Sequence, residues 1–365
     1  MIKYIYIDDE EPMAVESFVA GLNDTKLIEV ECLKLSNTDN IEGVIRKTVD
    51  GIKNGANGII FDLCLNGDGP NRISTTASPI AQEIRSLASS GSICHVPIVL
   101  CSTNENINGV FEPDKASHDL YDYKFCKTSV DFIQSAQILR SLAVGYLKIL
   151  SGVPITEILA RDNLERIDER VFDRFYDTEQ SPLDWSHFLI NEIFDHAGVL
   201  ISKDIMAARL GVDINASSDS WEALLASFGN KIMYRGVFYD GWTRFWSDLL
   251  SDQFERLTGY LYQALSATER VDKLNAALGL TLKPATALEF CTSTFFDTIC
   301  EGTRAPIDSI EAYEIAENLP LSPWQMPKYL SFYALTSGKF PNIKIKKREE
   351  ARFINDREAL LNGQD

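Results

Sequence analysis

The stretch Gly58-Ile-Ile-Phe-Asp-Leu-Cys-Leu-Asn-Gly67 carries the clearest fold signal in the chain. Ile59 to Phe61 is a short apolar run that ends directly on a carboxylate, Asp62. A strand with apolar residues on both faces is typical of a parallel sheet covered by helices on both sides. Ligands of such sheets bind at the carboxyl ends of the strands. We therefore expect Asp62 to lie at the functional edge of a parallel sheet.

Three further apolar runs end on polar side chains in the same way. Because the carboxyl ends of parallel strands meet at one edge of a sheet, we expect these side chains to gather around the lone Asp. The runs and the side chains that follow them are residues 2–7 with Asp8 and Asp9, residues 96–101 with Ser102, and residues 121–126 with Lys127.

This set of side chains makes chemical sense around a divalent cation. Clustered carboxylates are costly to ionise together unless a cation joins them. Mg²⁺ is a hard ion that binds carboxylates, carbonyl oxygens and waters. With the metal bound, Asp62 can attack a phosphoryl group and become an aspartyl phosphate. Ser102 and Lys127 can then hold the new phosphate oxygens.

In this order, the motifs resemble the receiver domain of bacterial two-component response regulators, over residues 1 to about 150. The resemblance implies that Asp8 and Asp9 are the acidic pair that binds Mg²⁺. It implies that Asp62 is both the phospho-acceptor and a metal ligand. It also implies that the backbone carbonyl of Cys64, two residues further on, binds the metal.

The same resemblance assigns the hydroxyl and the ammonium group. The family has Pro, four mostly apolar residues and then Thr or Ser, and Pro97-Ile-Val-Leu-Cys-Ser102 follows this pattern. The resemblance therefore implies that Ser102 is the switch hydroxyl and that Lys127 matches the family's Lys. Two neighbours of Lys127 depart from the family pattern. Thr128 replaces the usual Pro, and Lys124 stands where the family usually has Tyr or Phe.

The loop after the phospho-acceptor strand also departs from the pattern. Residues 66–78 are polar and Gly-rich, and they form a longer segment than the family norm. We expect a variable surface insertion beside the site.

Strand-like and helical segments alternate through the first 150 residues, and strand signals nearly vanish after Gly152-Val-Pro154. The alternation predicts an α/β, flavodoxin-like, doubly wound sheet of five parallel strands. We expect a receiver domain at residues 1–150 and a mostly α-helical output or interaction domain at residues 151–365. Its predicted helices cover residues 155–176, 182–194, 220–228, 242–265, 270–278, 285–300 and 309–318.

Net charge and the distribution of apolar residues indicate which partners and which cellular location to expect for the protein. The formal net charge of −18 opposes binding to a nucleic-acid backbone. Residues 339–352 are locally basic, and we expect a solvated charged face there. The chain has no apolar run long enough for a transmembrane helix and starts with a strand rather than a leader. We therefore expect a cytoplasmic protein that makes no membrane contact.

Residues 201–213 look like the first helix and turn of a helix-turn-helix. A DNA-reading second helix should carry Arg, Lys, Asn or Gln. The candidate, residues 217–226, is acidic and apolar instead, which favours a plain helical hairpin over DNA binding.

The leading hypothesis is a response regulator. A partner histidine kinase donates a phosphoryl group to Asp62, and the helical domain relays that state to a downstream protein partner. No enzymatic activity is expected beyond the receiver's own phosphorylation and dephosphorylation. Whether the chain forms a homodimer is left open.

Three alternatives remain. The first is a signalling adaptor or phosphate sink in a kinase-linked phage-defence system, which would give the chain an antiviral role. The second is a phosphatase of the haloacid-dehalogenase type, but that chemistry wants a second Asp where this chain has Cys64. The third is a degenerate receiver that never takes up phosphate.

Overall fold

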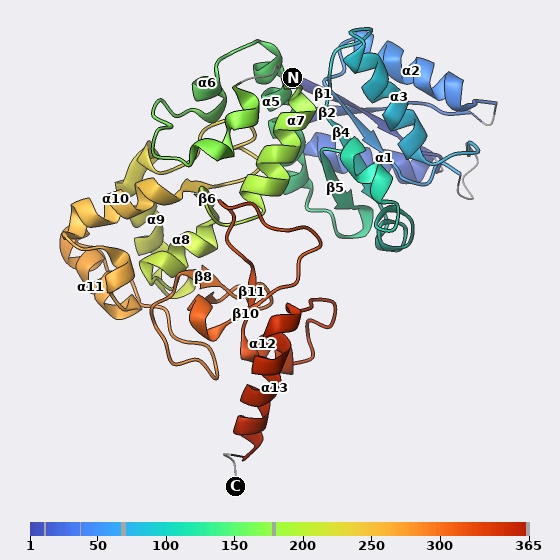
Figure 1. Ribbon diagram of the computed structural model, residues 1–365. Helices are drawn as coiled ribbons and strands as arrows, with labels where there is room; N and C mark the ends of the chain where they lie inside the picture. The colour runs from blue at the N-terminus through green and yellow to red at the C-terminus, as the bar shows by residue number, and fades with distance from the viewer. Residues whose placement is uncertain (11, 37, 67–70, 177–179, 363–365) are drawn as a thin grey trace. The chain divides into compact units, whose positions relative to one another are not determined.

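The computed structural model describes the chain except residues 11, 37, 67–70, 177–179 and 363–365 (Figure 1). The described chain divides into two compact units, each with its own core. The first unit contains residues 1–163, 172–189 and 235–242, and the second contains residues 164–171, 190–234 and 243–365. The predicted pair of domains, 1–150 and 151–365, stays a prediction.

A five-stranded parallel sheet forms the centre of the first unit, with strand order β2-β1-β3-β4-β5. This is the flavodoxin-like order of a doubly wound sheet, so the predicted fold class is confirmed. The strands are β1 (Ile2–Ile7), β2 (Ile28–Cys32), β3 (Gly58–Phe61), β4 (Ile98–Ser102) and β5 (Tyr123–Cys126).

Helices cover both faces of this sheet because the side chains of each strand alternate between the faces. Ile5 and Ile7 of β1 point into the core that α2 and α3 complete. Tyr4 faces the other way, and its hydroxyl donates to the carbonyl of Leu139 on α5 at 2.6 Å. The helices of this unit are α1 (Pro12–Asp24), α2 (Ile41–Lys53), α3 (Ala77–Ser89), α4 (Asn104–Asn106), α5 (Phe132–Leu150), α6 (Ile155–Leu159) and α7 (Pro182–His187).

Gly58, the first residue of β3, shows how closely these strands pack. A Cβ atom built at this position would lie 2.1 Å from the ring of Tyr4 on β1. Only glycine therefore fits beside that ring, and the contact helps to fix the register of β1 against β3.

Part of the predicted surface loop lies outside the described residues, namely 67–70. The described end of the loop is less exposed than predicted, because it folds back along the chain after β3. The amide of Ile73 donates to the carbonyl of Leu65 at 2.7 Å, and Ile73 is buried. The amide of Ala77 donates to the carbonyl of Leu63 at 2.9 Å.

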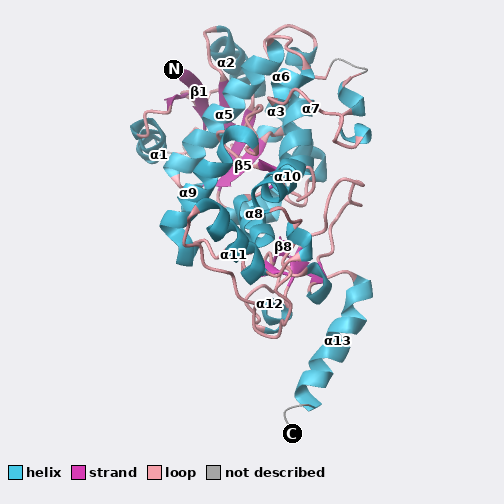
Figure 2. Ribbon diagram, turned by 90° about the vertical axis from the view of Figure 1, so that its left-hand side faces the viewer, coloured by secondary structure: helices cyan, strands magenta, loops and turns pink. Residues whose placement is uncertain are grey.

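The second unit is mainly helical, as predicted, with short two-stranded ladders between its helices (Figure 2). Its core is apolar and includes Trp221, Leu224, Phe228 and Phe254. The helices are α8 (Lys203–Leu210), α9 (Ser218–Phe228), α10 (Ser247–Thr258), α11 (Ala267–Leu278), α12 (Phe332–Thr336) and α13 (Lys347–Asn362). The ladders pair β6 (Leu200–Ile201) with β7 (Phe245–Trp246), β8 (Thr298–Ile299) with β9 (Pro306–Ile307), and β10 (Tyr313–Glu314) with β11 (Tyr329–Leu330).

Two predicted helices of this unit are wrong. Residues 285–300 contain no helix, because the backbone there bonds to a neighbouring segment: the amide of Ala285 donates to the carbonyl of Gly211 at 2.8 Å. Residues 309–318 form only a short 3₁₀ turn before β10, which pairs with β11 instead.

A third predicted helix, residues 242–265, is too long at both ends. The helix α10 begins only at Ser247, since the two residues before it pair with β6. It ends at Thr258, because the φ of 76° at the next residue, Gly259, lies in the left-handed region that glycine adopts readily and that commonly terminates helices.

The basic stretch near the C-terminus is not simply a solvated face. Lys346 and Arg348 both form ion pairs with the buried carboxylate of Glu314 on β10. These charges therefore fasten the start of α13 to its own unit, and α13 extends from there (Figures 1 and 2).

Arg270 on α11 is an almost fully buried cation, with 1% of its surface exposed. Burial lowers its pKa to about 10. Its guanidinium donates to backbone carbonyls from several separate segments. They belong to Tyr262 at 2.7 Å, Leu265 at 2.8 Å, Arg209 at 3.1 Å and Phe296 at 2.7 Å.

Replacing Arg270 by Met is expected to lower the free energy of unfolding by about 3 kcal/mol, because several buried carbonyls lose their donor at once. Urea denaturation measures this change. Lys283→Met, at an exposed position, is the control and is expected to change stability by no more than about 0.5 kcal/mol. Equal stabilities of the two variants would contradict the stabilising role that we give to the buried hydrogen bonds of Arg270.

Candidate functional site

The carboxyl edge of the five-stranded sheet gathers the acidic side chains that the sequence singled out. Ile7 and Phe61 are partners in the β1–β3 ladder, so Asp8 and Asp62 leave their strands side by side. The amide of Asp62 donates to the carbonyl of Ile7 at 2.9 Å. One carboxylate oxygen each from Asp8, Asp9 and Asp62 lies within 4.8 Å of the other two, and all three residues are buried.

Lys127, directly after β5, reaches into this acidic cluster. Its Nζ lies 2.6 Å from Oδ2 of Asp8 and 3.0 Å from Oδ1 of Asp62. Burial would lower the pKa of Lys127, but the charges of Asp62 and Asp8 outweigh it and raise the pKa above its ordinary value. The ammonium is therefore charged and bridges two of the three carboxylates.

Asp62 itself is held by its neighbours along the chain. The amide of Cys64 donates to its Oδ2 at 3.1 Å. Burial raises the pKa of the Asp62 carboxyl above its usual value, the charge of Lys127 opposes that shift, and the charge of Asp8 adds to it.

Ser102 is the last residue of β4 and is fully buried. The side chain of Ser102 acts on Asp62 and lowers the pKa of that carboxyl. Asn106, one turn further on, donates its side-chain amide to Oγ of Ser102 at 3.4 Å. The structure thus brings Ser102 to the same edge as Lys127 and the carboxylates.

Sequence reasoning missed one residue of the site, Tyr6. Its hydroxyl donates to Oδ2 of Asp8 at 2.5 Å, and the amide of Glu10 donates to Oδ1 at 2.9 Å. The period of a strand offered the signal, because Asp8 follows β1 two residues after Tyr6, and residues two apart in an extended chain point to the same face. A cavity of about 320 Å³ lies beside this group and is lined by Phe18 and Phe132 among others.

The donor set fits a hard divalent cation. Carboxylate oxygens are the ligands that Mg²⁺ prefers, and three of them lie close enough to share one ion. Lys127 supplies one positive charge against three acidic side chains, so the cluster keeps a negative charge that a divalent ion would balance.

The raised pKa of Asp62 predicts a pH-dependent cost in stability. Its folded pKa lies above the ordinary value of 3.8, so the folded state holds the proton more tightly than the unfolded chain. Stability contributed by this group falls as pH rises from 3.8 to the folded pKa, and the ionised group is a net cost at neutral pH. Without metal, Asp62→Asn should therefore raise Tm at pH 7 by about 2–4 °C.

Thermal denaturation in EDTA checks this expectation. The gain from Asp62→Asn should shrink as the pH is lowered through the folded pKa and below 3.8, where the carboxyl is protonated in both the folded and the unfolded parent chain. Asp24→Asn, at an exposed position on α1, should show no such gain. A lower Tm for Asp62→Asn than for the parent at pH 7 would contradict the account.

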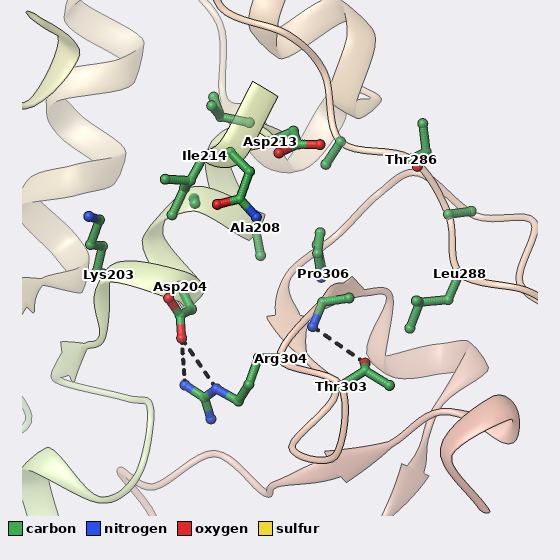
Figure 3. A pocket seen from close by; sticks show the side chains of 16 residues that line it. Lys203, Asp204, Ala208, Asp213, Ile214, Thr286, Leu288, Thr303, Arg304 and Pro306 are labelled. Atoms are coloured by element: carbon green, nitrogen blue, oxygen red, sulfur yellow. Dashed lines mark hydrogen bonds and ion pairs between the residues drawn. The ribbon is translucent and has the colours of Figure 1, made fainter. Parts of the chain in front are cut away.

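The second unit has a cavity of about 560 Å³ beside α8 (Figure 3). Asp204 and Arg304 point toward each other there, with Nη2 of Arg304 2.7 Å from Oδ2 of Asp204. Arg304 also pairs with Glu301 at 2.7 Å. Arg304, one of two cations that line this cavity with Lys203, is thus already paired with two carboxylates, and we assign the cavity no chemistry.

No protein-family model and no curated protein matches the chain. Among solved structures, the chain is similar to a LuxR-family DNA-binding response regulator from Staphylococcus aureus, at 16% identity over 38% of this chain and 94% of that chain, with a TM-score of 0.27. It is also similar to a two-component response regulator from Clostridium difficile, at 18% identity over 38% of this chain and 93% of that chain, with a TM-score of 0.25.

A third similar structure is the RcsB response regulator of Salmonella typhimurium, at 16% identity over 48% of this chain and 77% of that chain, with a TM-score of 0.22. At these TM-scores the comparisons carry no argument about function. The functional assignment therefore rests on the sheet order and on the geometry of the site.

Proposed function

We propose that this chain is a response regulator that accepts a phosphoryl group on Asp62 in a Mg²⁺-dependent reaction. One observation carries the proposal: three buried carboxylates that directly follow β1 and β3 converge within 4.8 Å, and Lys127 bridges two of them. That arrangement combines a metal-binding acidic set, a carboxylate nucleophile and a fixed cation at one sheet edge.

In this proposal Asp8, Asp9, Asp62 and the carbonyl of Cys64 would hold Mg²⁺, which would neutralise charge on the incoming phosphoryl oxygens. Oxygen of Asp62 attacks phosphorus, and the bond from phosphorus to the donor's leaving group breaks. Lys127 then turns from the carboxylate oxygen to a phosphate oxygen, and the Ser102 hydroxyl donates to another.

A histidine kinase is the proposed donor, and the protein is proposed to act in the cytoplasm. The described part of the chain contains no helix that is both long and apolar enough to cross a bilayer. The increase in negative charge at the sheet edge would shift the first unit between two states.

We further propose that the output is a protein interaction rather than DNA binding. The helix α9, which follows α8 where a recognition helix would stand, contains no Arg, Lys, Asn or Gln. Trp221, Leu224 and Phe228 of α9 are buried in the core of the unit. The strongly acidic chain supports the same conclusion.

Incubation with radiolabelled acetyl phosphate tests the proposed function. The parent chain should gain label with Mg²⁺, should lose it in EDTA, and should show none above background when Asp62 is replaced by Ala. The Asp24→Ala variant serves as the matched control and should label like the parent. An unlabelled parent chain, or a fully labelled Asp62→Ala variant, would contradict the proposal.

A further inference from the structure

The hydroxyl of Tyr6 contacts a proposed metal ligand directly. Tyr6 is 1% exposed and donates to Oδ2 of Asp8 at 2.5 Å. Its ring packs against Phe18 of α1, with 5.2 Å between the ring centroids. A buried ring on a central strand has little freedom, so the hydroxyl has one fixed position.

The carboxylate of Asp8 therefore has two kinds of partner. Tyr6 and the amide of Glu10 are fixed by the strand and by the turn after it, and they hold one oxygen each. Lys127 also contacts Oδ2, but on a flexible side chain that can leave when a metal or a phosphate binds. After Lys127 moves away, the Tyr6 hydroxyl still orients Oδ2 of Asp8.

We propose that Tyr6 is a positioning residue for the metal site, which holds the Asp8 carboxylate in the orientation that binds Mg²⁺. The inference rests on the proposed function, because it takes Asp8 to be a metal ligand. Hydrogen bonds to ligating carboxylates fix their orientation, and losing one typically costs about 10- to 100-fold in metal affinity. Tyr6→Phe removes the donor and keeps the ring that packs on Phe18.

Tyr4 offers a closely matched control. It lies on the same strand and the same face, it is fully buried, and its hydroxyl also donates a hydrogen bond, to the carbonyl of Leu139 at 2.6 Å. Tyr4→Phe thus deletes a buried hydroxyl of the same kind at a position away from the carboxylates.

Calorimetric titration with MgCl₂ alone, without a phosphoryl donor, tests the inference. Tyr6→Phe should weaken Mg²⁺ binding about tenfold, while Tyr4→Phe should leave the Kd within about twofold of the parent value. At saturating Mg²⁺, acetyl phosphate labelling of Tyr6→Phe should return to the parent level, because the defect lies in metal binding.

Three results would overturn the inference in distinguishable ways. Equal Mg²⁺ affinities of Tyr6→Phe and the parent would overturn it and leave the proposed function intact. A parent chain that binds no Mg²⁺ would overturn the proposed function as well. If Tyr6→Phe does not fold, Phe18→Leu provides the test, because it loosens the packing of the Tyr6 ring and keeps the Tyr6 hydroxyl. Weaker Mg²⁺ binding by Phe18→Leu would support the inference, and an unchanged Kd would overturn it.

Discussion

Replacing Lys127 by Met is expected to slow phosphoryl incorporation at Asp62 about 100-fold and to tighten Mg²⁺ binding at the same time. The slower reaction follows from the loss of a cation aimed at the developing phosphate charge, since removing one such donor typically costs about 10²–10³ in rate. The same ammonium contacts both Asp8 and Asp62.

The tighter metal binding follows from competition for the same oxygens. Lys127 lies 2.6 Å from Oδ2 of Asp8 and 3.0 Å from Oδ1 of Asp62, which are oxygens that a metal would share. Without the ammonium, the buried carboxylates repel one another more strongly, and a divalent ion relieves that repulsion. A slower labelling rate together with a higher Mg²⁺ affinity would indicate that Lys127 competes with the metal. A substitution that merely disrupted the site would lower both the rate and the affinity.

Lys124, on β5 just before Lys127, supplies the control. It is exposed and pairs with Glu112 rather than with the cluster, so Lys124→Met should change neither the labelling rate nor the Mg²⁺ affinity. Titration calorimetry and the time course of labelling measure the two effects. Weaker Mg²⁺ binding by Lys127→Met would contradict the account of this site.

Replacing Asp122 by Ala is expected to lower the free energy of unfolding by about 3–5 kcal/mol, which is the usual cost of removing one partner of a buried ion pair. The Asp122 carboxylate is buried directly before β5 and accepts from Arg85 at 2.8 Å, from the amide of Ile98 at 2.8 Å and from the Tyr146 hydroxyl at 2.5 Å. The hydroxyl of Ser186 on α7 donates to it as well.

The loss of stability in Asp122→Ala is large because the buried guanidinium of Arg85 stays in place. Arg85 also donates to the carbonyls of Leu120 and Val96, so it cannot turn toward water when Asp122 is gone. A buried guanidinium would then lack its counter-charge. Urea denaturation measures the loss, with exposed Asp119→Ala as the control, which should change stability by less than about 0.5 kcal/mol. A cost for Asp122→Ala as small as that of the control would contradict this prediction.

The presence of a five-stranded parallel sheet and the sheet edge at which the candidate site lies could be predicted because both follow from local patterns along the chain. Apolar runs such as Ile59 to Phe61 are short and end sharply, and the period-two geometry of strands then places the next side chain at the sheet edge. Asp8, Asp62 and Lys127 were found this way, and the structure brings them together.

Tyr6 and Asp122 were missed for a different reason. Each lies inside or beside an apolar run, where a sequence pattern shows only that the residue faces a core. The role of Asp122 depends on Arg85, which lies far away along the chain. The partner of Tyr6, Asp8, is only two residues away, but their hydrogen bond forms in a buried site where the Tyr6 ring packs against Phe18. Both contacts are properties of the packed fold.

The wrong helices of the second unit share a cause. Residues 285–300 and 309–318 have a composition that suits a helix, but their backbone groups find partners in neighbouring segments. Tertiary hydrogen bonds override such local preferences. By contrast, α11 has a capping box between Ser266 and Glu269, and its predicted helix was found with only the first turn misplaced.

The most direct test of the central claim locates the phosphoryl group on the chain. The protein is incubated with acetyl phosphate and Mg²⁺, the acyl phosphate is trapped by borohydride reduction, and peptides are mapped by mass spectrometry. The account predicts that the modified residue is Asp62 and that the modification disappears when Mg²⁺ is chelated. Modification at another residue, or incorporation that is indifferent to Mg²⁺, would contradict it.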